Sequence, residues 1–108
     1  MKIDYNYDAE ADAISVVISV KKADVTVELT EHLLADLTND GKVVGFEILD
    51  ASDEISKMFG RVVTREELKQ LLFDISPQPR NQYILHFYNP KTKENANFLF
   101  PLYRSPIA

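Results

Sequence analysis

The triplet Asn39-Asp40-Gly41 lies between two apolar stretches and constrains the fold more than any other segment. These residue types tolerate positive φ, and glycine does so without steric cost, so the triplet favours a β-hairpin turn. Residues 43–49 are rich in β-branched and apolar side chains, as expected of a buried strand. Helix-forming sequence follows at Ser52. The segment therefore predicts a hairpin strand that leads directly into a helix.

Alternation of apolar and polar residues, which is typical of half-buried strands, recurs through the first part of the chain. It is found in residues 2–7, 14–20, 25–29 and 33–37, before the strand that follows the hairpin turn. Five short strands joined by tight turns predict an antiparallel β-meander with one face covered.

Two helices are expected after these strands. The first spans about residues 53–59, with Ser52 as N-cap and Gly60 at its end, and is expected to cover the sheet. The second begins with a capping box at residues 64–67 and ends at Pro77. Its expected apolar stripe consists of Leu68, Leu71, Leu72 and Ile75.

The C-terminal part is expected to form a β-hairpin after a stiff, proline-containing connector at residues 76–82. Alternating apolar residues in 83–87 and 98–102 give its two strands, and Pro101 places the second at a sheet edge. The predicted fold class is α+β: an antiparallel β-meander of about five strands with two helices and a C-terminal β-hairpin.

The chain of 108 residues is expected to be a single domain. In this interpretation residues 1–60 form a core of sheet and helix, and residues 61–108 extend it with a helix and a hairpin. One helix and one hairpin could hardly bury a core alone, which argues against a domain boundary near Gly60.

Charge and composition exclude several function classes. Residues 1–60 carry five basic and 13 acidic residues (net −8), whereas residues 61–108 carry seven basic and four acidic (net +3). The acidic first half disfavours nucleic acid as the main ligand and is compatible with a basic partner or self-association. The absence of cysteine excludes disulfides, thiolate metal sites and a cysteine nucleophile. No membrane span or signal-peptide pattern is found, so a cytoplasmic location is expected.

Two segments carry a resemblance to a known family: residues 7–16, Tyr-Asp-Ala-Glu-Ala-Asp-Ala-Ile-Ser-Val, and residues 45–52, Gly-Phe-Glu-Ile-Leu-Asp-Ala-Ser. Their order and spacing resemble the prokaryotic "domain of unknown function 2283", over about the first 60 residues. The resemblance implies a small antiparallel sheet followed by a helix, and it implies no activity or functional residue. Members of this family resemble small cytoplasmic partner proteins found beside toxin-like genes, which favours a binding role.

Asp8, Glu10 and Asp12 place three carboxylates at alternate positions, as at the start of a calcium-binding loop. The pattern then fails, because Ala13 and Ser19 stand where glycine and glutamate are required. An acidic turn whose carboxylates accept backbone N–H bonds is the better interpretation, with a metal site as the alternative. No cofactor is expected.

No catalytic residue is assigned. None of the serines lies in a nucleophile motif, and His32 and His86 are interpreted as surface residues. His32 belongs to a turn, and His86 lies on the wetter face of its strand. A catalytic role would require the fold to bring a histidine beside carboxylates.

Aromatic residues crowd the last 26 positions, and Tyr88, Tyr103 and Arg104 are the contact candidates among them. The main hypothesis is a non-catalytic protein-interaction module, forming a homodimer through sheet edges or the aromatic tail, or binding a small basic protein as an antitoxin-like partner would. The alternative is a small carboxylate- and histidine-dependent hydrolase or a metal- or ligand-binding protein, using the Asp8–Asp12 carboxylates.

Overall fold

A computed structural model of the chain describes residues 4–79 and 82–100. The first sheet contains β1 (Asp4–Asp8), β2 (Ala13–Val17), β3 (Val25–Thr30), β4 (Leu33–Leu37) and β5 (Val43–Ile48). Two helices follow, α1 (Ala51–Phe59) and α2 (Arg65–Leu68). The second sheet contains β6 (Leu72–Gln78), β7 (Gln82–Tyr88) and β8 (Asn95–Phe100). The predicted α+β class is therefore confirmed.

The first sheet is antiparallel with the order β1-β2-β5-β4-β3. The predicted turn at Gly41 joins β4 to β5, and Gly41 has φ +85° and donates its N–H to Thr38 O. The order departs from a simple meander at one point, because β5 pairs with β2 and moves β3 to the far edge. The hairpin formed by β4 and β5, which the Asn39-Asp40-Gly41 turn predicts, thus lies near the centre of the sheet.

The predicted long second helix is wrong. Helix α2 ends at Leu68, and its expected continuation through Leu72 and Ile75 is strand β6. The apolar residues in this segment fit both a helical and an alternating pattern, and pairing with β7 supplies hydrogen bonds to the strand. Proline also disfavours helical geometry in the residue that precedes it, Ser76. The predicted cap is present, since Thr64 Oγ1 accepts from Glu67 N at 3.1 Å.

The predicted connector at 76–82 is also incorrect in part, because Ser76, Pro77 and Gln78 continue β6. Pro77 is tolerated there because β6 is an edge strand. The expected C-terminal hairpin is present as β7 and β8, and β6 extends it to three strands. The prediction that the last strand lies at an edge is confirmed, although Pro101 itself lies outside the described residues.

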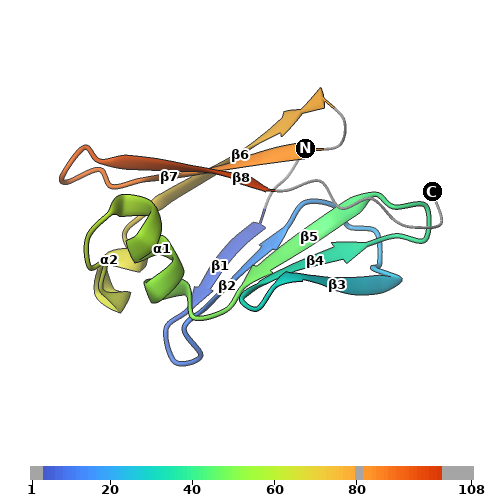
Figure 1. Cartoon of the computed structure of the whole chain (residues 1–108), viewed down its shortest axis with the longest axis horizontal. Helices are drawn as coiled ribbons and strands as arrows, with labels where there is room; N and C mark the ends of the chain where they lie inside the picture. The colour runs from blue at the N-terminus through green and yellow to red at the C-terminus, as the bar shows by residue number, and fades with distance from the viewer. Residues whose placement is uncertain (1–3, 80–81, 101–108) are drawn as a thin grey trace.

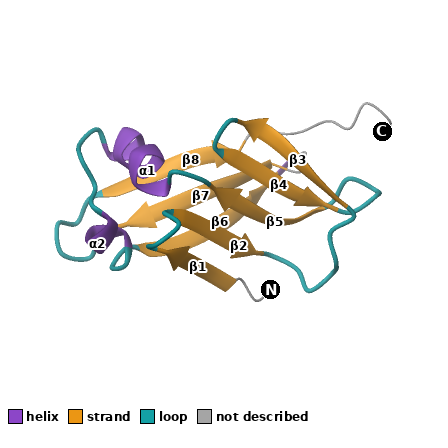
Figure 2. Ribbon diagram, turned by 90° about the horizontal axis from the view of Figure 1, so that it is seen from below, coloured by secondary structure: helices purple, strands orange, loops and turns teal. Residues whose placement is uncertain are grey.

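The two sheets lie face to face, with the helices at one end (Figures 1 and 2). Tyr5 stacks on Phe73 at a centroid distance of 4.9 Å, and Phe46 meets the edge of Tyr83 at 5.7 Å. These contacts place β6 over β1 and β7 over β5, so β8 lies on the β4–β3 side. The second sheet, more than helix α1, covers the first.

One apolar cluster connects both sheets and α1. Its fully buried side chains include Phe46 from β5, Ile55 from α1 and Phe87 from β7. Within residues 4–79 and 82–100, neither helix is long and apolar enough to cross a membrane.

Candidate binding pocket and strand edge

Asp12 holds the start of α1 against the β1–β2 turn. Its carboxylate accepts hydrogen bonds from Tyr7 OH (2.7 Å), Ser52 N (3.0 Å) and Ser52 Oγ (2.6 Å), and its carbonyl accepts from Ala51 N (2.8 Å). The expectation that Ser52 caps the helix is therefore wrong. Asp50 precedes the helix without a side-chain cap bond, and Asp12 supplies the acceptor that these N–H groups need.

Asp12 is only 6% exposed. Burial alone would raise its pKa, but the hydrogen bonds from Ser52 and Tyr7 outweigh burial and hold the pKa below its usual range. Asp12 has a positive φ of 53°, a conformation that aspartate tolerates better than most residues. The Asp12 carboxylate therefore has a structural role, because its hydrogen bonds connect β1 and the β1–β2 turn to the start of α1.

In the Asp8–Asp12 turn, the carboxylates of Asp8 and Asp12 accept hydrogen bonds from within the protein. Asp8 Oδ1 accepts from the backbone N–H groups of Glu10 (3.0 Å) and Ala11 (3.2 Å), as the acidic-turn interpretation expects. Within the described part of the chain, no group of three His, Asp or Glu side chains is placed to hold a metal ion.

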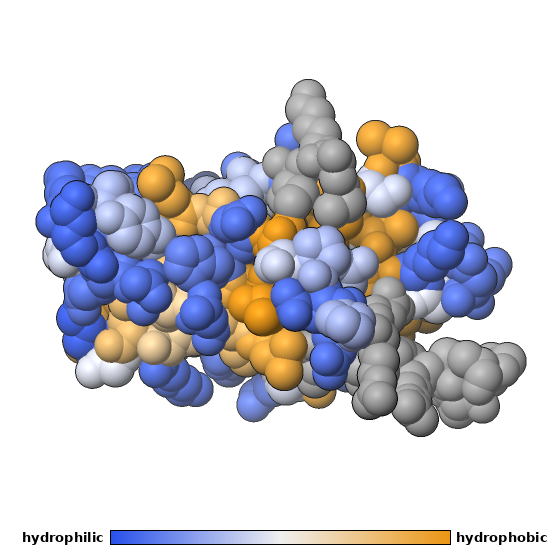
Figure 3. Space-filling view, turned by 90° about the horizontal axis from the view of Figure 1, so that it is seen from above, coloured by the Kyte–Doolittle hydropathy of each residue, from blue (hydrophilic) through white to orange (hydrophobic). Residues whose placement is uncertain are grey.

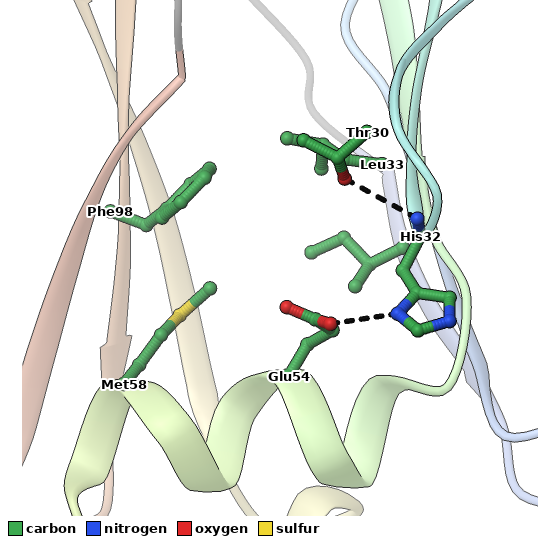
Figure 4. A pocket seen from close by; sticks show the side chains of 7 residues that line it. Thr30, His32, Leu33, Glu54, Met58 and Phe98 are labelled. Atoms are coloured by element: carbon green, nitrogen blue, oxygen red, sulfur yellow. Dashed lines mark hydrogen bonds and ion pairs between the residues drawn. The ribbon is translucent and has the colours of Figure 1, made fainter.

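A pocket of about 100 Å³ lies between β8, α1 and the turn from β3 to β4 (Figure 4). Its apolar walls come from both sheets and the helix, and His32 and Glu54 form its polar side (Figure 4). The lining residues are Thr30, His32, Leu33, Ile48, Glu54, Met58 and Phe98.

His32 bridges two carboxylates at the start of α1. Its Nδ1 lies 2.8 Å from Glu54 Oε1, and its Nε2 lies 2.9 Å from Asp50 Oδ2. A neutral imidazole can donate from only one nitrogen, so the protonated ring suits this arrangement best. The hydrogen bond to Glu54, with the charge of Asp50, raises the pKa of His32. Burial opposes the shift at Glu54, but the bond from His32 lowers its pKa overall.

The His32 bridge predicts a pH-dependent stability. The pKa of His32 is higher in the folded protein than in the unfolded chain, where it is about 6.5. The stability that the protonated His32 bridge contributes is therefore complete below about pH 6.5 and is lost as the pH rises through the folded pKa. We expect the melting temperature of the wild type to fall relative to that of His32→Gln as the pH rises above about 6.5. A His86→Gln variant controls for loss of an imidazole elsewhere. Parallel pH curves for wild type and His32→Gln would contradict the bridge.

Four of the described strands lie at sheet edges: β1, β3, β6 and β8. Natural edge strands are protected from pairing by charges, prolines or bulges. β1 has Asp4 and Asp8 at its ends, and β3 has Glu28 next to a register shift. β6 contains Asp74 and Pro77. β8, with the sequence Asn-Ala-Asn-Phe-Leu-Phe and a regular register, has none of these features.

The register of β8 also indicates which backbone groups face the open edge. Asn89 N donates to Glu94 O, which sets the alternation of hydrogen-bonded pairs along the hairpin. By this alternation the backbone groups of Ala96 and Phe98 bond to β7, and those of Asn97 and Leu99 point away from it. β8 therefore presents N–H and C=O groups along an edge without the usual protection.

A network of charges fixes the hairpin that carries β8. Arg61 Nη2 donates to Glu67 and to Glu94 Oε1 (2.7 Å), and Asn89 Nδ2 donates to Glu67 Oε2 (2.7 Å). The hydrogen bonds that Arg61 donates to Glu67 and Glu94 raise the pKa of Arg61. This network ties the α1–α2 connection to the β7–β8 turn and holds β8 beside the helix.

The outer face of the second sheet mixes apolar and polar side chains (Figure 3). Leu72 and Leu99 are 57% and 53% exposed on it. The contact candidate Tyr88 shares this face and pairs with Leu72 across the strands, and His86 lies on the same face, as expected. Tyr103 and Arg104 lie outside the described residues.

Sequence reasoning did not find the pairing of His32 with Glu54, because 22 residues separate them and no local spacing joins them. The structure brings His32 beside carboxylates, but these are Asp50 and Glu54 instead of the expected Asp8–Asp12 group.

These features define a two-sheet α+β protein with a small pocket beside an open strand edge. Residues 4–52 match the family described as "Protein of unknown function (DUF2283)", a segment that runs from β1 into the first turn of α1. The two segments that carry the resemblance meet in the contact between Asp12 and Ser52. Neither a curated protein nor a solved structure matches the chain.

Proposed function

We propose that the protein is a non-catalytic protein-interaction module that pairs with an extended segment of another chain along β8. The observation that carries this proposal is the edge of β8, which contains no charged residue, proline or bulge. Each of the other three edge strands contains a charged residue or a proline. Addition of a strand to such an edge supplies main-chain hydrogen bonds and is a recurring mode of peptide recognition.

Two occupants suit this edge. A second copy could pair its own β8 antiparallel to the first, which gives the two-fold symmetry common in homodimers. A small basic protein could bind instead, as an antitoxin-like partner would, because the chain carries a net charge of −5.

The proline variant Asn97→Pro tests the edge. Because the N–H of Asn97 points away from β7, proline there should preserve the sheet and remove one donor from the free edge. Asn97→Ala, which keeps the N–H, is the matched control. We expect association, measured by light scattering and by stoichiometric capture from the source cells, to persist in Asn97→Ala and to weaken about tenfold or more in Asn97→Pro. Equal association of the two variants would contradict binding along β8.

A second candidate is a small ligand-binding protein, which the pocket beside His32 and Glu54 favours. The pocket contains a histidine, His32, and a carboxylate, Glu54, but the Asp8–Asp12 carboxylates of the expected hydrolase are not among its lining residues. Ligand binding alone would be unaffected by Asn97→Pro, which separates this candidate from the first.

A further inference from the structure

The pocket lies where a strand added to β8 would project its side chains. β8 covers the β4–β3 side of the first sheet, and α1 lies beneath it (Figures 1 and 2). An added strand would run about 4.8 Å from β8, with alternate side chains on the inner face. Those side chains would face α1 and the pocket between Met58 and Phe98 (Figure 4).

The pocket combines an apolar interior with one carboxylate. Glu54 uses Oε1 to accept from His32, and its other oxygen points toward the space between Met58 and Phe98 (Figure 4). Lys57 Nζ lies 3.5 Å from the same Oε1, but the lysine side chain is 72% exposed. Among the described residues, His32 and Lys57 both contact Glu54 through Oε1, so their positive charges are directed to that oxygen and not to the one that faces the pocket.

A second copy does not complement this pocket. β8 contains no lysine or arginine, so β8–β8 pairing would bring only uncharged side chains against Glu54. Because His32 and Lys57 contact Oε1, covering the pocket-facing oxygen of Glu54 with uncharged groups would remove the hydration of that oxygen without a new donor, which is unfavourable. A basic segment avoids this cost, and its charge complements the acidic first part of the chain.

We propose that the segment bound along β8 belongs to a basic protein and inserts a side chain with an aliphatic stem and a positive end, as in lysine or arginine, into this pocket. The stem contacts Met58 and Phe98, and the positive end binds Glu54. A cavity of about 100 Å³ suits one such stem, since a cavity of about 150 Å³ accommodates benzene. This inference rests on the proposed strand addition and specifies the chemistry of the partner.

A library of random seven-residue peptides, selected for binding to the purified full chain, tests the inference. We expect the selected peptides to share an alternating pattern with lysine or arginine enriched at one position. A selected lysine peptide should bind the wild type at least about tenfold more tightly than its norleucine analogue, because norleucine keeps the stem and lacks the charge. Glu54→Gln should abolish this preference, whereas Glu66→Gln, which removes an exposed carboxylate on α2, should retain it.

The possible outcomes distinguish failure of the pocket assignment from failure of the proposed strand addition. Peptides that need the N–H of Asn97 but show no preference for a basic residue would overturn the pocket assignment and leave strand addition in place. Peptides that bind Asn97→Pro as well as Asn97→Ala, or a selection that yields no binder, would overturn both. Melting curves of each variant confirm that it is folded.

Discussion

Replacing Asp12 with alanine is expected to lower the free energy of unfolding by about 3 kcal/mol. The substitution removes the acceptor of Tyr7 OH and of both donor groups of Ser52, and it leaves these partly buried donors without a protein partner. Alanine also fits the positive φ of this position poorly. Urea unfolding monitored by circular dichroism measures the change.

Asp12→Asn is the matched control for this prediction. Asparagine tolerates positive φ and keeps one acceptor oxygen, so it should lose less stability than alanine. Asp8→Ala, at an exposed carboxylate of the same turn, should cost less than either. An Asp12→Ala protein as stable as Asp8→Ala would show that the contact with the start of α1 contributes nothing.

The second large effect is expected in the core. Phe46→Ala in the first sheet and Phe87→Ala in the second should each lower the free energy of unfolding by about 3–5 kcal/mol, because both side chains are fully buried in one cluster. Since that cluster joins the sheets, each variant should unfold both sheets in a single transition. Calorimetry checks this, and two separate transitions would contradict a single domain.

Strands β2 and β4 could be predicted because buried residues alternate with more exposed ones, as with Ile14 and Val16 of β2. The order of the strands could not, because alternation fixes which face is buried but not which strand pairs with which. The helical spacing of Leu68, Leu71, Leu72 and Ile75 predicts a helix where the structure has strand β6. The stacking of Phe73 on Tyr5, which favours a strand there, depends on two distant segments.

The candidate site was predictable only in part. The edge position of β8 followed from Pro101, and its lack of charge can be read from the residues themselves. The hydrogen bonds between Asp12 and Ser52 join residues 40 positions apart, and the His32 bridge joins a turn to a helix. Neither contact therefore produces a pattern in the local sequence. Such contacts form only once the strands between them have paired.

Hydrogen exchange of the backbone amides of β8 tests the central claim most directly. In the free protein the N–H groups of Asn97 and Leu99 face the open edge and should exchange rapidly, whereas those of Ala96 and Phe98 bond to β7 and should exchange slowly. When the protein is associated with its partner, exchange at Asn97 and Leu99 should slow at least about tenfold. Unchanged exchange at these two amides, with new protection along β1 or β3, would contradict binding at β8.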